Sequence, residues 1–157
     1  MTYPLIIAFE MSGDSDDAFP LAIAWSLPEG SIKSTLIQPE DEWLEETDDR
    51  YLDIDTDHLY QQGHSAKAVL EELQLDREQE PLYAPGYYTA ERGLEKLYAT
   101  VEGDNDLPLR PLQELLVDHS PDEVEALLQE SRLLLDLDPY TAEGQVRLWL
   151  EVYARLQ

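Results

Sequence analysis

Apolar residues in the first 39 positions follow the spacing of β-strands. Residues 3–9 form a nearly continuous apolar run, which predicts a buried strand. In residues 19–27, large apolar side chains alternate with small ones, as in a strand whose two faces pack differently. Residues 31–39 predict a third strand, which the chain reaches through a turn at residues 28–30. Connections this short predict an antiparallel meander.

Later in the chain the apolar spacing changes to that of helices. One helix is expected near residues 66–73, and a second is expected to be capped by Thr89. A third begins at the Ser-Pro-Asp-Glu capping motif of residues 120–123, and a last one begins near Thr141. A short strand is expected at residues 81–85. The side chains expected on the buried helix faces are Ala66, Val69, Leu70, Leu73, Ala90, Leu94, Leu97, Tyr98, Val124, Leu127, Leu128, Ser131, Ala142, Val146, Trp149, Leu150 and Tyr153.

Residues 38–57 show neither spacing and are strongly acidic, so we expect an irregular loop there. This run forms either a solvated loop or a contact surface. Trp43 stands alone among its charges, and it either packs back onto the core or anchors a partner. Strands followed by a helix, a strand and further helices predict a mixed α/β sheet with flanking helices. Without an internal repeat or a linker, residues 1–157 are expected to form a single domain.

Composition narrows the class of protein. Of the 157 residues, 43% are hydrophobic and 29% are charged, which is typical of a globular chain. There are no cysteines, and this excludes disulfides and thiolate metal sites. No apolar run approaches the ~20 residues of a membrane span, and no basic stretch followed by an apolar run opens the sequence. These features predict a cytoplasmic protein that does not associate with membranes.

The acidic excess bears on the kind of partner. Asp and Glu number 35 against 10 Lys and Arg, so the formal net charge is −25. The basic residues occur singly, as at Lys33 and Arg110, and form no stripe. Because repulsion slows the approach to a polyanion, direct nucleic-acid binding is disfavoured. A basic protein partner is the favoured alternative, although solubility alone also accounts for such a charge.

Several short motifs occur in an order that matches a known family. The first strand ends in Ala8-Phe9-Glu10, followed by Ser12-Gly13, and the third ends in the apolar-x-Pro motif Ile37-Gln38-Pro39. Residues 54–63, where Gly63 would close a short helix, and residues 82–98 and 140–156 complete the series. This layout resembles the DnaQ-like and ribonuclease T-like 3′–5′ exonucleases, which have the ribonuclease H-like fold. The resemblance implies an antiparallel meander followed by parallel strands, with flanking helices.

The resemblance also implies where a catalytic site would lie. Members of this family hold two Mg²⁺ or Mn²⁺ ions with Asp and Glu side chains, and a histidine deprotonates the attacking water. Of the family's acidic motif positions, only the one at the end of the first strand carries an acid in this sequence, namely Glu10. The motif positions that carry other residue types are Ala8, the stretch between Pro85 and Ala90, Tyr140 at the histidine and Gln145 at the final Asp. One carboxylate cannot hold two divalent ions, so the resemblance implies a degenerate site with no metal and no cofactor.

Other carboxylates leave a relocated metal site open as an alternative. Asp138 and Glu143 have the spacing of the last motif, and Glu91 lies near the second. Asp14, Asp16 and Asp17 follow the first strand. Acidic residues are so common in this chain that some fall near any motif by chance. Mg²⁺ or Mn²⁺ is therefore expected only if such a rearranged site exists.

The remaining candidate residues each have a structural alternative. Glu10 can instead accept backbone N–H bonds at the turn that follows it. The pair Tyr87-Tyr88 can stack on bases, contact a partner or pack beneath a loop, and the charge favours packing or partner contact. The three histidines lack the spacing of a zinc site and lie in polar stretches: His58, His64 and His119.

These inferences favour a non-catalytic, exonuclease-like protein that acts as an acidic protein-binding or regulatory module. Trp43, Tyr87 and Tyr88 are its candidate partner contacts. The first alternative is an active metal-dependent 3′–5′ exonuclease with a rearranged carboxylate site. The second is a nucleic-acid mimic, whose carboxylates imitate phosphates. Exonucleases of this family are often homodimers, so the resemblance also implies a homodimer.

Overall fold

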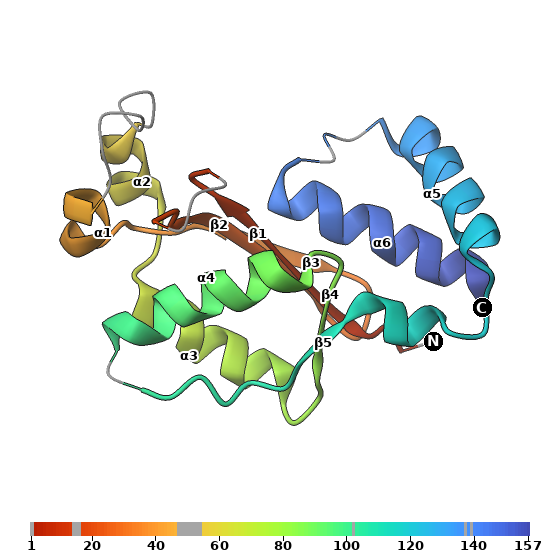
Figure 1. The fold of residues 1–157 in the computed structure, drawn as a ribbon, viewed down its shortest axis with the longest axis horizontal. Coiled ribbons are helices and arrows are strands. Elements are labelled where there is room, and N and C mark those ends of the chain that lie inside the picture. Colours follow the sequence, from red (N-terminus) through yellow and green to blue (C-terminus); the bar gives the residue numbers. More distant parts are fainter. Residues whose placement is uncertain (1, 14–16, 47–54, 102, 137, 139) are drawn as a thin grey trace.

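A five-stranded mixed sheet forms the centre of the molecule (Figure 1). The computed structural model describes residues 2–13, 17–46, 55–101, 103–136, 138 and 140–157. In spatial order the strands are β3, β2, β1, β4 and β5. β1 pairs antiparallel with β2, and β2 pairs antiparallel with β3, whereas β4 runs parallel to β1 and β5 runs parallel to β4. The strand bounds are Leu5–Met11 for β1, Pro20–Ser26 for β2, Ile32–Leu36 for β3, Leu82–Ala84 for β4 and Leu109–Pro111 for β5.

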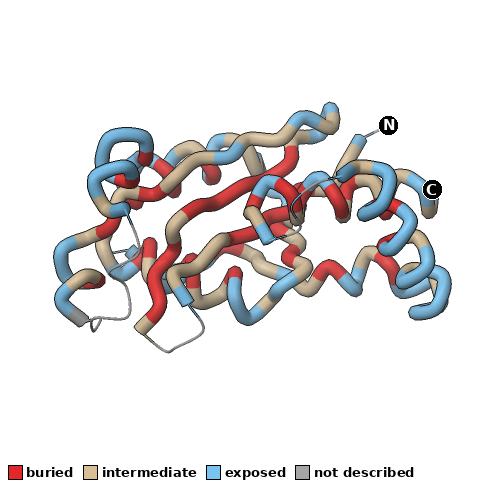
Figure 2. The backbone as a smooth tube through the Cα atoms, turned by 90° about the horizontal axis from the view of Figure 1, so that it is seen from above, coloured by how far each residue is buried: buried red, intermediate tan, exposed pale blue. Residues whose placement is uncertain are grey.

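The apolar run of β1 is continuous because helices cover both faces of the sheet. Successive side chains of a strand point to opposite faces. Leu5, Ile7 and Phe9 therefore join one apolar layer, while Ile6 and Ala8 join the other. α3 (Ala66–Arg77) and α4 (Tyr87–Thr100) pack against the first layer, and α6 (Ala142–Leu156) contacts β1, β2 and β3 in the second. In Figure 2 the buried residues are concentrated along the strands and on the inward sides of these helices.

Outside these layers, α5 (Pro121–Leu135) packs on α6, with Leu128, Leu148 and Val152 buried between the two helices. A 3₁₀ helix, η2 (Leu112–Leu116), connects β5 to α5. Two predicted core residues of α6, Trp149 and Tyr153, are only half-buried, as are Val124 and Leu127 of α5. They lie on the flanks of their apolar stripes, where the helix surface turns toward solvent.

The helix starts follow the predicted caps in two of three cases. Ser120 accepts a hydrogen bond from the Glu123 N–H at 3.1 Å, and Thr141 accepts one from the Gly144 N–H at 3.0 Å. The prediction that Thr89 caps α4 is wrong. The helix begins at Tyr87, three residues earlier than a Thr89 cap would allow, and its N-cap is Gly86, which offers no side-chain acceptor. Thr89 therefore lies within the first turn.

The acidic segment after β3 also differs from the predicted loop. It contains the short helix α1 (Asp41–Glu46), and a second short helix, α2 (Thr56–Gln62), follows and ends at Gly63, as the resemblance implied for residues 54–63. Each is held by a buried apolar side chain, Trp43 in α1 and Leu59 in α2, and Asp55 caps α2 by accepting from the His58 N–H at 3.1 Å. Single anchors of this kind leave no periodic signal in the sequence. Residues 47–54 of this segment lie outside the described residues.

The sheet has one strand more than the sequence predicted, and β3 is shorter than expected. β5 spans three residues, so it is too short to show an alternating pattern. β3 ends at Leu36, and Ile37 forms an isolated parallel bridge with His64. Across the part of the chain described here, no helix combines the length and the apolar character that a bilayer span requires.

Candidate functional site

One edge of the sheet gathers most of the positions that the sequence singled out. The carboxyl ends of β1, β4 and β5 meet there because these strands run parallel. Glu10 lies near the end of β1, and the turn Pro85-Gly86 links β4 to α4. α6 begins beside Glu10, since Thr141 and Glu143 line a cavity that Glu10 also lines. Crevices outside the carboxyl ends of parallel strands are common ligand sites.

Glu10 marks the point at which β1 leaves its regular pairing. It lies opposite Ala22, and the register with β2 shifts between Glu10 and Met11. The following Ser-Gly turn has a structural role, because Ser12 exchanges two bonds with Phe19. The Ser12 N–H donates to the Phe19 carbonyl at 2.8 Å, and the Phe19 N–H donates to the Ser12 hydroxyl at 3.0 Å. Ser12 thus closes the connection to β2.

The Glu10 carboxylate is half-buried, and its pKa is raised. Burial is the main cause, because it penalises the charged form, and the nearby charge of Asp138 adds to it. Residues 14–16, which follow the Ser-Gly turn, lie outside the described residues. The structural role of accepting backbone N–H bonds there stays a prediction.

Polar cavities lie on both sides of Glu10. One, of about 360 Å³, is lined by Glu10 together with Thr89, Arg92 and Tyr140. The other, of about 410 Å³, is lined by Glu10 together with His64 and Glu143. Tyr140 is 83% exposed, so its ring lies at the rim and not in the interior. These cavities are where the resemblance would place metal ions and substrate.

Two of the substituted motif positions, Ala8 and Ala90, have apolar surroundings. Ala8 is 3% exposed and lies in the layer under α6, with Ala142 and Val146. Ala90 is 1% exposed and faces the opposite layer, inside α4. Gln145 is half-buried in the first turns of α6. The structure thus brings Ala8, Glu10 and the start of α6 together, with Asp138 and Glu143 near Glu10.

The capacity of this edge to hold metal can be judged from its oxygen donors. Within the described residues, no group of three or more His, Cys, Asp or Glu side chains is arranged to hold an ion. Glu143 pairs with Arg147 at 3.5 Å, and Glu91 is hydrogen-bonded to Tyr87. Asp14 and Asp16 lie outside the described residues. A pair of hard divalent cations needs several carboxylates, so the described residues do not fit such a pair.

The aromatic candidates, Trp43 and the pair Tyr87-Tyr88, occupy very different places. Trp43 is 3% exposed and stacks on Phe19, with ring centroids 5.9 Å apart and planes inclined by 23°. The sequence allowed Trp43 either to pack onto the core or to anchor a partner, and the structure shows it in the core. In this conformation its side chain is therefore not available to a partner. Trp43 belongs to α1, and its apolar ring is removed from water because it points from this helix into the core. Tyr88, in contrast, is 80% exposed, and its ring lies 5.8 Å from that of Tyr87 in an edge-on arrangement.

The histidines lie at the surface. His58 and His64 are exposed, and His119 is half-buried with its Nδ1 atom 3.5 Å from Glu123. Two residues beside Tyr87 and Tyr88 were missed by the sequence analysis, namely Pro111 and Gln113. Pro111 ends the unpredicted strand β5, whose three residues gave no periodic signal, and Gln113 lies in η2, which follows it.

Comparisons with known proteins show the fold. No protein-family model matches the sequence, and no curated protein matches it. A chain of the structure described as the yeast NOT1 MIF4G domain co-crystallised with CAF1 is similar, with a TM-score of 0.60 and 13% identity. That match covers 97% of this chain and 77% of the other. The RNase domain of the yeast Pop2 protein is similar with a TM-score of 0.58 and 14% identity, over 97% of this chain and 75% of the other. The predicted ribonuclease H-like fold class is confirmed.

Proposed function

We propose that this chain is a non-catalytic, exonuclease-like protein that acts as an acidic protein-binding or regulatory module. The observation that carries the proposal is the surroundings of Glu10. Its strand neighbour on the same face is Ala8, which is packed among apolar residues, and no metal-binding group is found among the described residues. A carboxylate in these surroundings cannot by itself neutralise a metal pair.

The overall charge supports a protein partner in preference to a nucleic acid. At −25, the chain repels polyanions and attracts basic surfaces, and this steering acts most strongly at low ionic strength. One structural neighbour comes from a crystal that contains the NOT1 MIF4G domain together with CAF1. A chain of similar fold therefore occurs in a protein complex.

A second candidate function is an active 3′–5′ exonuclease with a rearranged carboxylate site. The observation in its favour is that Asp138 is close enough to raise the pKa of Glu10, while Glu143 lines a cavity with it. In that case these carboxylates would hold Mg²⁺ or Mn²⁺. The two functions differ in whether Glu10 is needed for turnover.

The test is release of the 3′-terminal nucleotide from end-labelled single-stranded DNA and RNA in Mn²⁺. Wild-type protein is compared with Glu10→Gln, purified in parallel so that contaminating nucleases contribute equally. We expect no release above that of the variant. Turnover that is lost in both Glu10→Gln and Asp138→Asn would contradict the non-catalytic proposal and support the rearranged site.

A further inference from the structure

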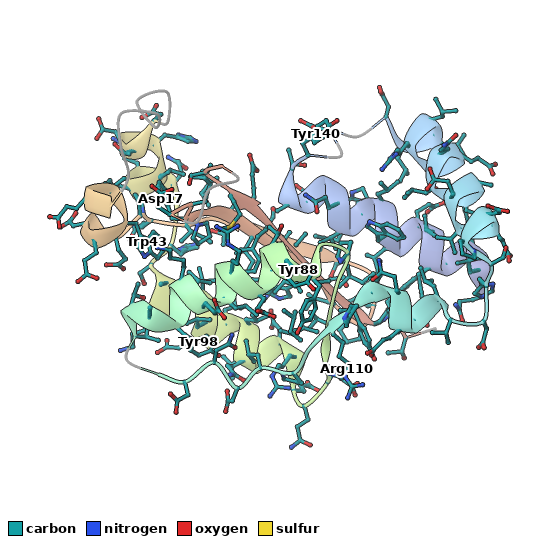
Figure 3. The ribbon with its side chains drawn as sticks, viewed as in Figure 1. Asp17, Trp43, Tyr88, Tyr98, Arg110 and Tyr140 are labelled. Atoms are coloured by element: carbon teal, nitrogen blue, oxygen red, sulfur yellow. The ribbon has the colours of Figure 1, made fainter. Side chains whose placement is uncertain are left out.

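A groove of about 560 Å³ opens at the carboxyl ends of β4 and β5, apart from Glu10. We call it the tyrosine–proline groove, after Pro85, Tyr87, Tyr88 and Pro111, which line it together with Gln113. The parallel pairing of β4 and β5 brings Ala84 opposite Pro111, so the segments that follow the two strands form its walls. Figure 3 shows Tyr88 at the start of α4 and Arg110 on strand β5.

The aromatic pair gives the groove its shape. The ring planes of Tyr87 and Tyr88 are inclined by 83°, and Tyr88 is 80% exposed. The two rings are in edge-to-face contact, so together they form one aromatic surface at the groove. Tyrosine contributes a large, rigid contact area at a low cost in conformational entropy, which is why it is enriched at binding surfaces.

The backbone at this point supplies hydrogen-bond donors. The N–H groups in the first turn of an α-helix have no partner within the helix. In α4 no side chain caps them, because the N-cap is Gly86. A chain in the polyproline II conformation makes no internal hydrogen bonds, so its carbonyl oxygens are free to accept, while its prolines donate nothing. The donors of the groove therefore match an occupant that has mainly acceptors.

The rim of the groove is acidic. Burial raises the pKa of Tyr87, and the nearby carboxylates of Glu91 and Glu114 raise it further. Glu114 also pairs with Arg110 at 3.4 Å, and both of these side chains are about half exposed. The net charge of the whole chain is −25, so an occupant that carries Arg or Lys is attracted to this rim. A second copy of the chain or a polyanion is repelled.

We propose that the tyrosine–proline groove binds an extended, proline-containing segment of a protein partner, with Arg or Lys next to the prolines. The inference rests on the proposed protein-binding function and assigns it a site and a partner chemistry. Prolines pack against aromatic rings with little loss of conformational entropy, because the free segment is already extended. The basic residue meets the carboxylates of Glu91 and Glu114.

The test is the fluorescence anisotropy of a labelled peptide made of consecutive prolines followed by arginines. A peptide of the same length and charge, with glycine and serine in place of the prolines, serves as the ligand control. Tyr88→Ala is expected to weaken binding of the proline peptide at least about tenfold. Tyr140→Ala is the matched protein control, since Tyr140 is similarly exposed but lines a different cavity. Glu114→Gln is expected to weaken binding by about two- to fivefold, because it removes one rim charge.

Several outcomes would overturn the inference. These are no saturable binding of the proline peptide, equal binding of the glycine–serine peptide, or equal losses in Tyr88→Ala and Tyr140→Ala. Binding of a labelled oligothymidylate that Tyr88→Ala weakens, without binding of the peptide, would assign the groove to single-stranded nucleic acid instead. Unchanged circular dichroism of each variant shows that it is folded. Nuclease turnover, measured separately, bears on the proposed function and not on the groove.

Discussion

The carboxylate of Glu10 lies between two polar cavities at the end of a central strand, and its pKa is raised by burial and by Asp138. A raised pKa means that the folded protein favours the protonated form more than the unfolded chain does. The stability that this provides is present below the unfolded value of about 4.5 and is lost as the pH rises through the folded value. At neutral pH the ionised side chain therefore weakens the fold.

This argument predicts that Glu10→Gln stabilises the protein at pH 7, because glutamine keeps a similar shape without the charge. Since the group is only partly buried and water screens it, we expect the Tm to rise by about 1–2 °C. Below a pH of about 4.5 the difference should close, because wild-type Glu10 is then protonated. Thermal melts followed by circular dichroism at both pH values measure this.

Glu143→Gln is the matched control, since it removes an exposed charge that pairs with Arg147 and should give no gain in Tm. A lower Tm for Glu10→Gln at pH 7 would contradict the argument. It would mean that the ionised carboxylate makes a favourable interaction in the folded protein.

Residue type alone identified candidates but not their surroundings. Trp43 was compatible with the core or with a partner surface, and only its stacking on Phe19 separates the two. The same holds for Tyr88, whose local sequence does not reveal that its ring is exposed beside Pro111. Burial of one aromatic residue depends on what the rest of the chain places around it.

At the scale of elements, α4 lies unusually close to the sheet where Gly93 faces β1. A Cβ atom on residue 93 would lie 2.8 Å from the ring of Phe9, which is closer than packed carbon atoms approach. The glycine therefore sets the distance between α4 and β1. It also sets where the tyrosines at the start of the helix stand relative to β4 and β5.

We predict that Gly93→Ala lowers the free energy of unfolding by about 1 kcal/mol, because overpacking outweighs the gain of about 1 kcal/mol in helix propensity. Urea unfolding followed by circular dichroism measures it. Gly103→Ala is the control, since its Cβ would meet the Tyr98 ring at an ordinary 3.6 Å. Equal stability of Gly93→Ala and the wild type would show that α4 can shift without cost.

Elements with several apolar residues on one face were predicted, and elements held by a single contact were missed. The strands of the meander and the helices α3, α4, α5 and α6 carry repeated apolar positions, so their patterns are visible in the sequence. α1 and β5 are short, and their stability comes from neighbours far along the chain. The short helix α2 has no apolar pattern of its own, and only the resemblance indicated it. The start of α4 was misplaced because glycine at its N-cap gives no side-chain signal.

At the scale of the whole molecule, the charge of −25 acts on the folded state through mutual repulsion of carboxylates. Because the folded chain holds these charges closer together than the unfolded chain does, screening should stabilise it. We predict that raising NaCl from about 20 to about 200 mM increases the Tm by a few degrees, since the Debye length then falls below about 10 Å.

The same melts at lower pH provide the control. The salt effect should shrink as the pH approaches the isoelectric point of about 4.1, where the net charge vanishes. A salt effect of the same size at both pH values would point to general salt effects on apolar burial in place of charge screening.

The sequence by itself determined the α/β class, the antiparallel meander and the main helices. These features depend on local spacing and residue type, which can be read from the sequence without knowledge of the fold. Only the tertiary structure decided that β5 joins the sheet, that Trp43 is buried, and that Tyr87 and Tyr88 form a groove with Pro111. Each of these depends on contacts between segments distant along the chain, and such contacts arise from the packing of the whole domain.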